Sequence, residues 1–268
     1  MFHNCDNDII ISQILLNSKC YNILEAILKE VTGRNLFIKE IIDNEYLLKE
    51  SFVSKKLIYA YDIHKNEIII DINITKSDDI SVSKKNALIL NKTYLGLLKN
   101  NLYKTTKKKE LIQINFDITK AYEKEYITKK ALEPKEIGFT CSIISCPVIY
   151  NVYLENLKFI SKGNLKKINK YKYLIMLVLN KNKLKKYAKE MQDEIINKYR
   201  IYLESLNNDE NFKQMISLIQ LYRMISYDRI YEEMLTIASR MILKDFNERD
   251  ILDITHINKN DLKLLRGK

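Results

Sequence analysis

The residues that most constrain the fold of this chain are positions 68–74, which read Ile-Ile-Ile-Asp-Ile-Asn-Ile. Isoleucine is β-branched and packs well on the pleated surface of a sheet, so the run predicts a strand near the middle of a sheet. A second apolar run, 57–63, precedes it, and the polar residues 64–66 between the two runs predict a tight turn. We therefore expect a sheet that contains this hairpin.

The other segments before residue 170 predict strands and helices in an order typical of an α/β fold. The expected strands are residues 37–47, 111–118 and 147–154, and the expected helical segments are residues 8–32 and 81–103. The first helical segment is broken near Asn17 and ends at Gly33, since glycine commonly stops a helix. A helix between two strands of one sheet predicts a crossover connection.

The character of the chain changes near Lys170. Residues 174–243 contain no glycine and have the pattern of consecutive helices, and residues 248–265 predict two short amphipathic helices. The lysine-rich span 158–172 is the expected boundary. We therefore predict an α/β domain at 1–170 and an all-α region at 171–268 that ends in a small helix-turn-helix-like hairpin.

The net charge of +11 permits a nucleic-acid partner. The abundance of Lys, Asn, Ile and Tyr is also typical of an AT-rich genome, so both explanations of the charge stay open. No apolar run reaches the roughly 20 residues that span a bilayer, and the first residues lack the basic region of a signal peptide. We expect a cytoplasmic protein with no membrane association and with reduced cysteines.

Several segments resemble the Rpn family of recombination-promoting nucleases, also described as PD-(D/E)XK family transposases. In that family a hairpin ends in an apolar strand that carries Glu-x-Gln, and residues 68–75 are similar to that strand. A later strand of the family reads Val-Ile-Gln-Ile-Asn, and residues 111–116 resemble it. Residues 237–265 resemble the closing segments, with His256 in place of the usual glycine. The resemblance implies a restriction-endonuclease-like mixed sheet with flanking helices, and DNA as the partner.

The resemblance also implies Mg²⁺ as cofactor, because nucleases of this fold hold a divalent cation with carboxylates from two adjacent strands. That cation polarises the phosphate and lowers the pKa of the attacking water. In one alignment Asp71 and Asn73 take the places of Glu and Gln, Asp62 is the nearest second carboxylate, and Asp8 is a remote ligand. In the other alignment Asn73 takes the place of Glu, and the metal ligand is lost.

Three functions are compatible with these residues. The first is a Mg²⁺-dependent DNA endonuclease in which Asp62, Asp71 and Asn73 are catalytic and Asp8, Asp62 and Asp71 bind the metal. The second is a catalytically degenerate nuclease fold that binds nucleic acid or a protein partner, for instance as an inhibitor or regulator. The third is a decaying mobile-element gene without a selected activity. Against catalysis, residues 57–59 stand where the family has its first aspartate, and none of them binds a cation.

Lysines near the expected central helix and on the last helix are the candidate phosphate contacts. They are Lys84, Lys85, Lys104, Lys107, Lys108, Lys109 and Lys263. For the lysines at 104–109 a solvated loop is the competing interpretation.

Overall fold

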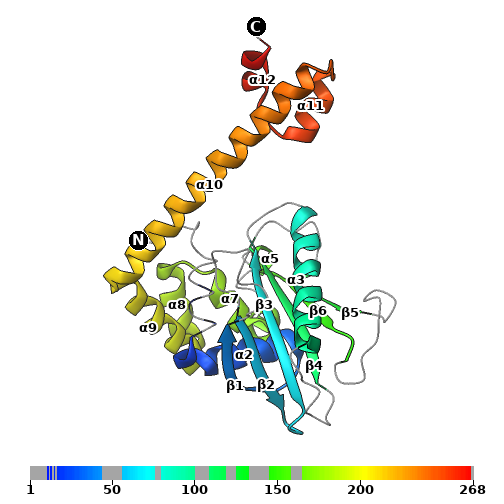
Figure 1. Ribbon diagram of the computed structural model, residues 1–268. Coiled ribbons are helices and arrows are strands. Elements are labelled where there is room, and N and C mark those ends of the chain that lie inside the picture. Colours follow the sequence, from blue (N-terminus) through cyan, green and yellow to red (C-terminus); the bar gives the residue numbers. More distant parts are fainter. Residues whose placement is uncertain are drawn as a thin grey trace. The chain divides into compact units, whose positions relative to one another are not determined.

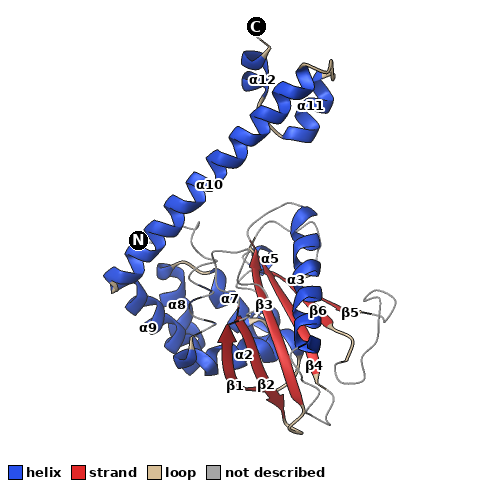
Figure 2. Ribbon diagram, in the orientation of Figure 1, coloured by secondary structure: helices blue, strands red, loops and turns tan. Residues whose placement is uncertain are grey.

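The computed structural model describes residues 11, 13, 15, 17–43, 56–75, 80–99, 109–118, 125–132, 145–157 and 165–266. The chain forms two compact units, residues 1–205 and 206–268. The first is an α/β unit with a mixed six-stranded sheet and flanking helices, and the second is helical (Figure 1, Figure 2). None of the described helices combines the length and the apolar character that a membrane crossing requires.

The sheet has the strand order β1-β2-β3-β4-β6-β5. Its strands are β1 (Leu36–Asp43), β2 (Lys56–Asp62), β3 (Glu67–Thr75), β4 (Glu110–Asp117), β5 (Ile127–Ala131) and β6 (Val148–Tyr153). β1, β2 and β3 are antiparallel neighbours, whereas β4 is parallel to β3 and β6 is parallel to β4. β5 is an antiparallel edge strand. The expected hairpin is confirmed as β2 and β3, and the expected α/β character is confirmed as well.

Helices cover both faces of this sheet. α3 (Ile80–Lys99) connects β3 to its parallel neighbour β4 and lies across one face, and α2 (Tyr21–Thr32) lies on the other (Figure 1). Gly33 ends α2 with φ 73°, and its N–H donates to the carbonyl of Lys29. This left-handed conformation is one that glycine adopts without a steric penalty, so the predicted helix stop is confirmed.

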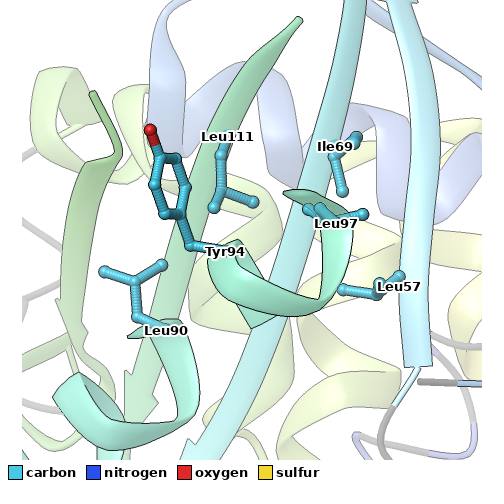
Figure 3. Packing of buried hydrophobic residues seen from close by; sticks show 6 residues of the cluster. All are labelled: Leu57, Ile69, Leu90, Tyr94, Leu97 and Leu111. Carbon is cyan, nitrogen blue, oxygen red and sulfur yellow. The ribbon is translucent and has the colours of Figure 1, made fainter. Parts of the chain in front are cut away.

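The face under α3 has an apolar cluster at one end. It contains Leu57, Ile69 and Leu111 from β2, β3 and β4, and Leu90, Tyr94 and Leu97 from α3. Figure 3 shows Leu97 beside Leu57 and Ile69, and Tyr94 beside Leu111. All six are nearly inaccessible to solvent, so this cluster holds the crossover helix on the sheet by hydrophobic burial.

The first unit continues past the boundary that the lysine-rich span predicts. Its later helices are α5 (Leu154–Leu157), α6 (Leu165–Lys170), α7 (Lys172–Val178), α8 (Lys181–Met191) and most of α9 (Glu194–Asn208). The Glu30 carboxylate, at the end of α2, accepts the N–H groups of Tyr173 (2.9 Å) and Leu174 (3.0 Å). These are orphan donors of the first turn of α7, so α2 caps α7 and joins the later helices to the sheet.

The second unit consists of α10 (Glu210–Ile242), α11 (Glu248–Thr255) and α12 (Lys259–Leu265). Its core contains Ala238, Met241, Ile251, Ile257 and Leu262. His256 ends α11 in a left-handed conformation, φ 53°. The two short helices that residues 248–265 predict are therefore confirmed.

The buried cluster under α3 generates a stability prediction. Leu90→Ala removes a side chain that is 1% exposed, so we expect the free energy of unfolding to fall by about 2–5 kcal/mol. The matched control is Leu88→Ala on the same helix, where the side chain is 54% exposed and the expected change stays within about 0.5 kcal/mol. Urea titration followed by circular dichroism measures both, and equal losses would contradict this packing.

Candidate functional site

The face under α3 changes from apolar to polar toward the carboxyl ends of the parallel strands. Side chains on one face of a strand alternate with period two, so Asp71 and Asn73 of β3 follow Ile69 on this face. On β4, Gln113 and Asn115 follow Leu111 in the same way. The parallel register places Asp71 opposite Gln113 and Asn73 opposite Asn115, so two rows of polar side chains cross the middle of the sheet.

These polar side chains are buried and are connected by hydrogen bonds. Asp71 is 0% exposed and Gln113 is 1% exposed. The Asp71 Oδ2 atom accepts from Gln113 Nε2 (3.1 Å) and from Asn73 Nδ2 (3.2 Å). Asn73 Nδ2 also donates to Asn115 Oδ1 (3.2 Å), and Asn115 Nδ2 donates to Gln113 Oε1 (3.4 Å). The four side chains therefore form a closed ring, in which each takes part in at least two hydrogen bonds.

The ring extends to the edge of the sheet. Asn115 Nδ2 donates to Asn151 Oδ1 on β6 (2.9 Å), and Asn151 Nδ2 donates to the Thr128 hydroxyl on β5 (3.3 Å). We call the six residues Asp71, Asn73, Gln113, Asn115, Asn151 and Thr128 the polar ladder. Asn151 and Thr128 are half-buried, so the polar ladder runs from the interior of the sheet to its accessible edge.

Helix α3 also contacts the polar ladder. Gln113 Nε2 donates to the backbone carbonyl of Asn86 (3.1 Å). The side chain of Asn86 is buried as well, and its Oδ1 atom has no hydrogen-bond partner among the described residues. A buried amide oxygen without a donor is costly, and such groups are rare in folded proteins. Asn86 is therefore a polar position of α3 that packing alone does not explain.

The structure separates the two carboxylates that the sequence pairs as metal ligands. The β2 residue in register with Asp71 is Leu57, which belongs to the apolar cluster. Asp62 lies five residues farther along β2, about 16 Å away at the usual rise per strand residue. Because five is an odd number, its side chain also points to the opposite face of the sheet. Asp62 and Asp71 therefore do not meet, and Asp8 lies outside the described residues.

Asp62 instead stabilises the turn of the hairpin. Its Oδ1 atom accepts the N–H groups of His64 and Asn66 (both 2.9 Å), and Oδ2 accepts from Asn66 Nδ2 (3.0 Å). Arg34 lies 3.4 Å from the same oxygen. The side-chain and backbone hydrogen bonds from Asn66, then the His64 N–H and the Arg34 charge, lower the pKa of Asp62 to about 2 against the opposing effect of desolvation.

The residues around Asp71 do not fit a Mg²⁺ ion. Magnesium requires near-octahedral oxygen coordination. Asp71 Oδ2 faces two amide N–H₂ donors, and the neighbouring strand presents Leu57. The buried Asp71 Oδ1 atom receives no hydrogen bond from the described residues, but a single carboxylate oxygen does not supply such a coordination sphere. Asp117 also carries a carboxylate on β4, but it lies four residues beyond Gln113, about 13 Å along the strand. In the part of the chain that the structure describes, no three His, Cys, Asp or Glu side chains gather as a possible metal site.

The predicted phosphate contacts belong to several different elements of the chain. Lys109 is buried, and its ammonium group pairs with Glu67 at 2.6 Å. Lys263 is exposed on α12. Lys84 and Lys85 belong to α3, and Lys104, Lys107 and Lys108 lie outside the described residues.

Most residues of the polar ladder were not predicted from the sequence alone. Asn151 and Thr128 are ordinary polar residues in strand-like segments, and no short motif singles them out. Gln113 and Asn115 belong to the segment that resembles the Val-Ile-Gln-Ile-Asn strand, but the sequence analysis gives them no role in a site. The available signal was the repeated spacing of Asp71-x-Asn73 and Gln113-x-Asn115 in two apolar runs. A crossover helix between these runs makes them parallel neighbours, which can bring equally spaced polar residues together.

Comparisons with models of protein families, with curated proteins and with solved structures find no match for this chain.

The polar ladder generates a prediction at its most connected member. Asn115→Leu keeps a similar volume but removes the hydrogen bonds to Asn73, Gln113 and Asn151, so their amide groups lose partners in a buried place. We expect the free energy of unfolding to fall by about 1–3 kcal/mol or more. Asn91→Leu on the exposed side of α3 is the control, and urea titration of both variants measures the difference. Equal stability of parent and Asn115→Leu would contradict the network.

Asp62 generates a prediction of pH dependence. Its pKa is lower in the folded protein than in the unfolded chain, so its contribution to stability is present above about pH 4 and is lost as the pH falls toward 2. We expect Asp62→Asn to have a lower urea midpoint than the parent at pH 7, and the gap to close between pH 4 and pH 2. Glu40→Gln, an exposed change in β1, controls for the lost charge. A gap that stays constant with pH would refute this role.

Proposed function

We propose that this chain is a nuclease-like protein that binds nucleic acid without hydrolysing it, with the polar ladder in the place of a metal site. The order of its elements supports a restriction-endonuclease-like core. A helix precedes an antiparallel hairpin, and a crossover helix leads from the hairpin to a parallel strand. This is the order in which the segments that resemble the Rpn family follow one another.

The observation that carries the proposal is the pairing of Leu57 with Asp71. In the alignment that keeps an acid, Asp71 takes the place of the family's second carboxylate. The first carboxylate belongs on the neighbouring strand, and the residue in register there is a leucine with 1% exposure. One carboxylate among amide donors does not hold a divalent cation in the open coordination that hydrolysis of a phosphodiester requires.

The residues that resemble the family's conserved strand have a structural use in this chain. In the alignment that keeps an acid, Asn73 takes the place of the family's Gln, and it donates to both Asp71 and Asn115. Gln113 and Asn115, in the strand that resembles Val-Ile-Gln-Ile-Asn, complete the ring. We therefore infer a nuclease-like frame whose polar positions bond to one another.

The distribution of charge supports nucleic acid as the partner. Residues 206–268 hold ten basic and ten acidic side chains, so the whole surplus of +11 falls in residues 1–205. A general enrichment in lysine would spread the surplus over both units. Concentrated positive charge attracts phosphate backbones through counterion release, so the α/β unit is the part of the chain that we propose to bind.

A cleavage and binding assay tests the proposal. We expect supercoiled plasmid to stay intact with Mg²⁺, Mn²⁺ or EDTA, because the described site lacks a second carboxylate. In EDTA, we expect the protein to shift labelled oligonucleotides in a gel. Asp71→Asn keeps an oxygen acceptor for the amides and should leave both results unchanged.

Two outcomes would overturn the proposal. Metal-dependent nicking that Asp71→Asn abolishes would show an active Mg²⁺-dependent endonuclease. Failure of the folded parent to bind DNA or RNA at low salt would remove the nucleic-acid partner and favour a module that binds protein.

A further inference from the structure

The segment that follows the sheet is the most basic part of the chain. Residues 156–189 contain eleven lysines and no aspartate or glutamate. These residues include helices α6, α7 and α8, which belong to the α/β unit. Lysines with exposed side chains in this segment are Lys166, Lys167, Lys170, Lys181, Lys183, Lys185, Lys186 and Lys189. Such clustering distinguishes a phosphate-binding surface from a general lysine surplus.

Two tyrosines lie among these lysines. Tyr126 immediately precedes β5, and Tyr171 lies between α6 and α7, with 5.3 Å between the ring centroids and an interplanar angle of 54°. The ammonium group of Lys167 lies 5.6 Å from the centre of the Tyr126 ring, and that of Lys170 lies 5.2 Å from the Tyr171 ring. We call these four residues the lysine–tyrosine strip.

The strip is built on fixed backbone. The carbonyl of Tyr126 accepts the N–H of Tyr153, at the carboxyl end of β6 (2.9 Å). Tyr171 is the N-cap residue of α7, the helix that Glu30 caps through its first-turn N–H groups. Tyr126 also lies two residues before Thr128, where the polar ladder reaches the edge of the sheet. Both tyrosines are half-buried residues, so neither is enclosed in the core.

From this arrangement we propose that the lysine–tyrosine strip binds single-stranded nucleic acid, with bases against the two tyrosines and phosphates at Lys167 and Lys170. This inference rests on the proposed function and assigns it a surface. Aromatic rings with cations beside them are the arrangement by which proteins bind single strands without sequence preference, because every base has a face that can stack. In duplex DNA the bases are already stacked on one another and offer the rings no such face.

The same features disfavour an anionic membrane as the partner. A helix that lies on a membrane surface needs an apolar face that enters the lipid. In α8, the most lysine-rich of these helices, the central apolar residue Leu184 is 1% exposed and faces the protein interior. The lysines of α8 therefore lack an insertable apolar face, whereas those of the strip lie beside aromatic rings.

Fluorescence polarisation with a labelled oligothymidylate of about 20 nucleotides tests the strip on the full-length protein. We expect Lys167→Gln with Lys170→Gln to weaken binding at least tenfold at 50 mM salt. The slope of log K against log salt should become shallower by about 1.4, because each single-strand phosphate contact contributes roughly 0.7. Lys39→Gln with Lys244→Gln removes two exposed charges elsewhere and should leave the affinity within about twofold.

The tyrosine variants separate stacking from charge. We expect Tyr171→Leu to weaken binding about tenfold without a change in the salt slope, because a stacked base releases no counterions. Tyr171→Phe keeps the ring and should bind as the parent does. Circular dichroism and urea midpoints select variants that remain folded, and Tyr126→Leu with Tyr126→Phe repeats the comparison if Tyr171→Leu does not fold.

Other outcomes show whether the strip, the proposed function or both are wrong. In one outcome the parent and the strip variants bind equally well, while Lys259→Gln with Lys263→Gln weakens binding. The binding surface is then the hairpin of the second unit, which contradicts the proposal for the strip and leaves the proposed function in place. Tighter binding to duplex than to single strands would overturn the single-strand assignment. If the parent binds phosphatidylserine vesicles and neither nucleic acid, both the strip and the proposed function fail.

Discussion

The burial of Asp71 is the constraint on which the rest of the α/β unit depends. A carboxylate that is 0% exposed in a central strand is costly unless its oxygens receive hydrogen bonds. Asn73 and Gln113 supply two hydrogen bonds, both to Oδ2, while the buried Oδ1 atom receives none from the described residues. Gln113 reaches Asp71 only because β3 and β4 are parallel and in this register. A shift of one residue would turn Gln113 to the other face of the sheet. The polar ladder thereby selects one pairing among several that the isoleucine-rich strands could otherwise adopt.

The same face of the sheet also determines where α3 lies. At one end Leu90, Tyr94 and Leu97 pack on apolar strand residues. At the other end the backbone carbonyl of Asn86 accepts a hydrogen bond from Gln113. Hydrophobic contacts alone tolerate sliding, because they are not directional, whereas a hydrogen bond to one carbonyl requires one position along the axis. The division of the face into an apolar and a polar end therefore fixes both the direction and the axial position of the helix.

The sequence alone predicts the architecture well, because hydrophobic periodicity determines it. The isoleucine run, the turn at 64–66 and the glycine at position 33 predict β2, β3 and the end of α2. β5 is missed because an edge strand with two exposed lysines, Lys129 and Lys130, has no apolar pattern. The lysine-rich span suggests a boundary near Lys170, but the cap that Glu30 makes on α7 joins α7 to the first unit. That contact spans more than 140 residues and leaves no local signal.

The candidate site was harder to predict because strand pairing determines which residues meet there. Asp62 and Asp71 are near in sequence, yet antiparallel pairing places Asp62 beside the turn and brings Leu57 opposite Asp71. Gln113, Asn115, Asn151 and Thr128 gain their importance only from the rows in which the sheet aligns them. The sequence shows the residue types, whereas their hydrogen-bond partners are known only once the strand register is known.

A carboxylate buried for a structural role and a carboxylate that binds a metal need opposite surroundings. A catalytic metal needs oxygens that face a solvent-filled position and keep lone pairs for the ion and its waters. In the polar ladder Asp71 Oδ2 already accepts from two amides inside the core, and opening that place would break the network that holds β3 to β4. Surface binding has no such conflict, since the exposed lysines of α6 and α8 lie on separate elements. The buried Asp71 and the proposed surface binding are therefore compatible within one fold.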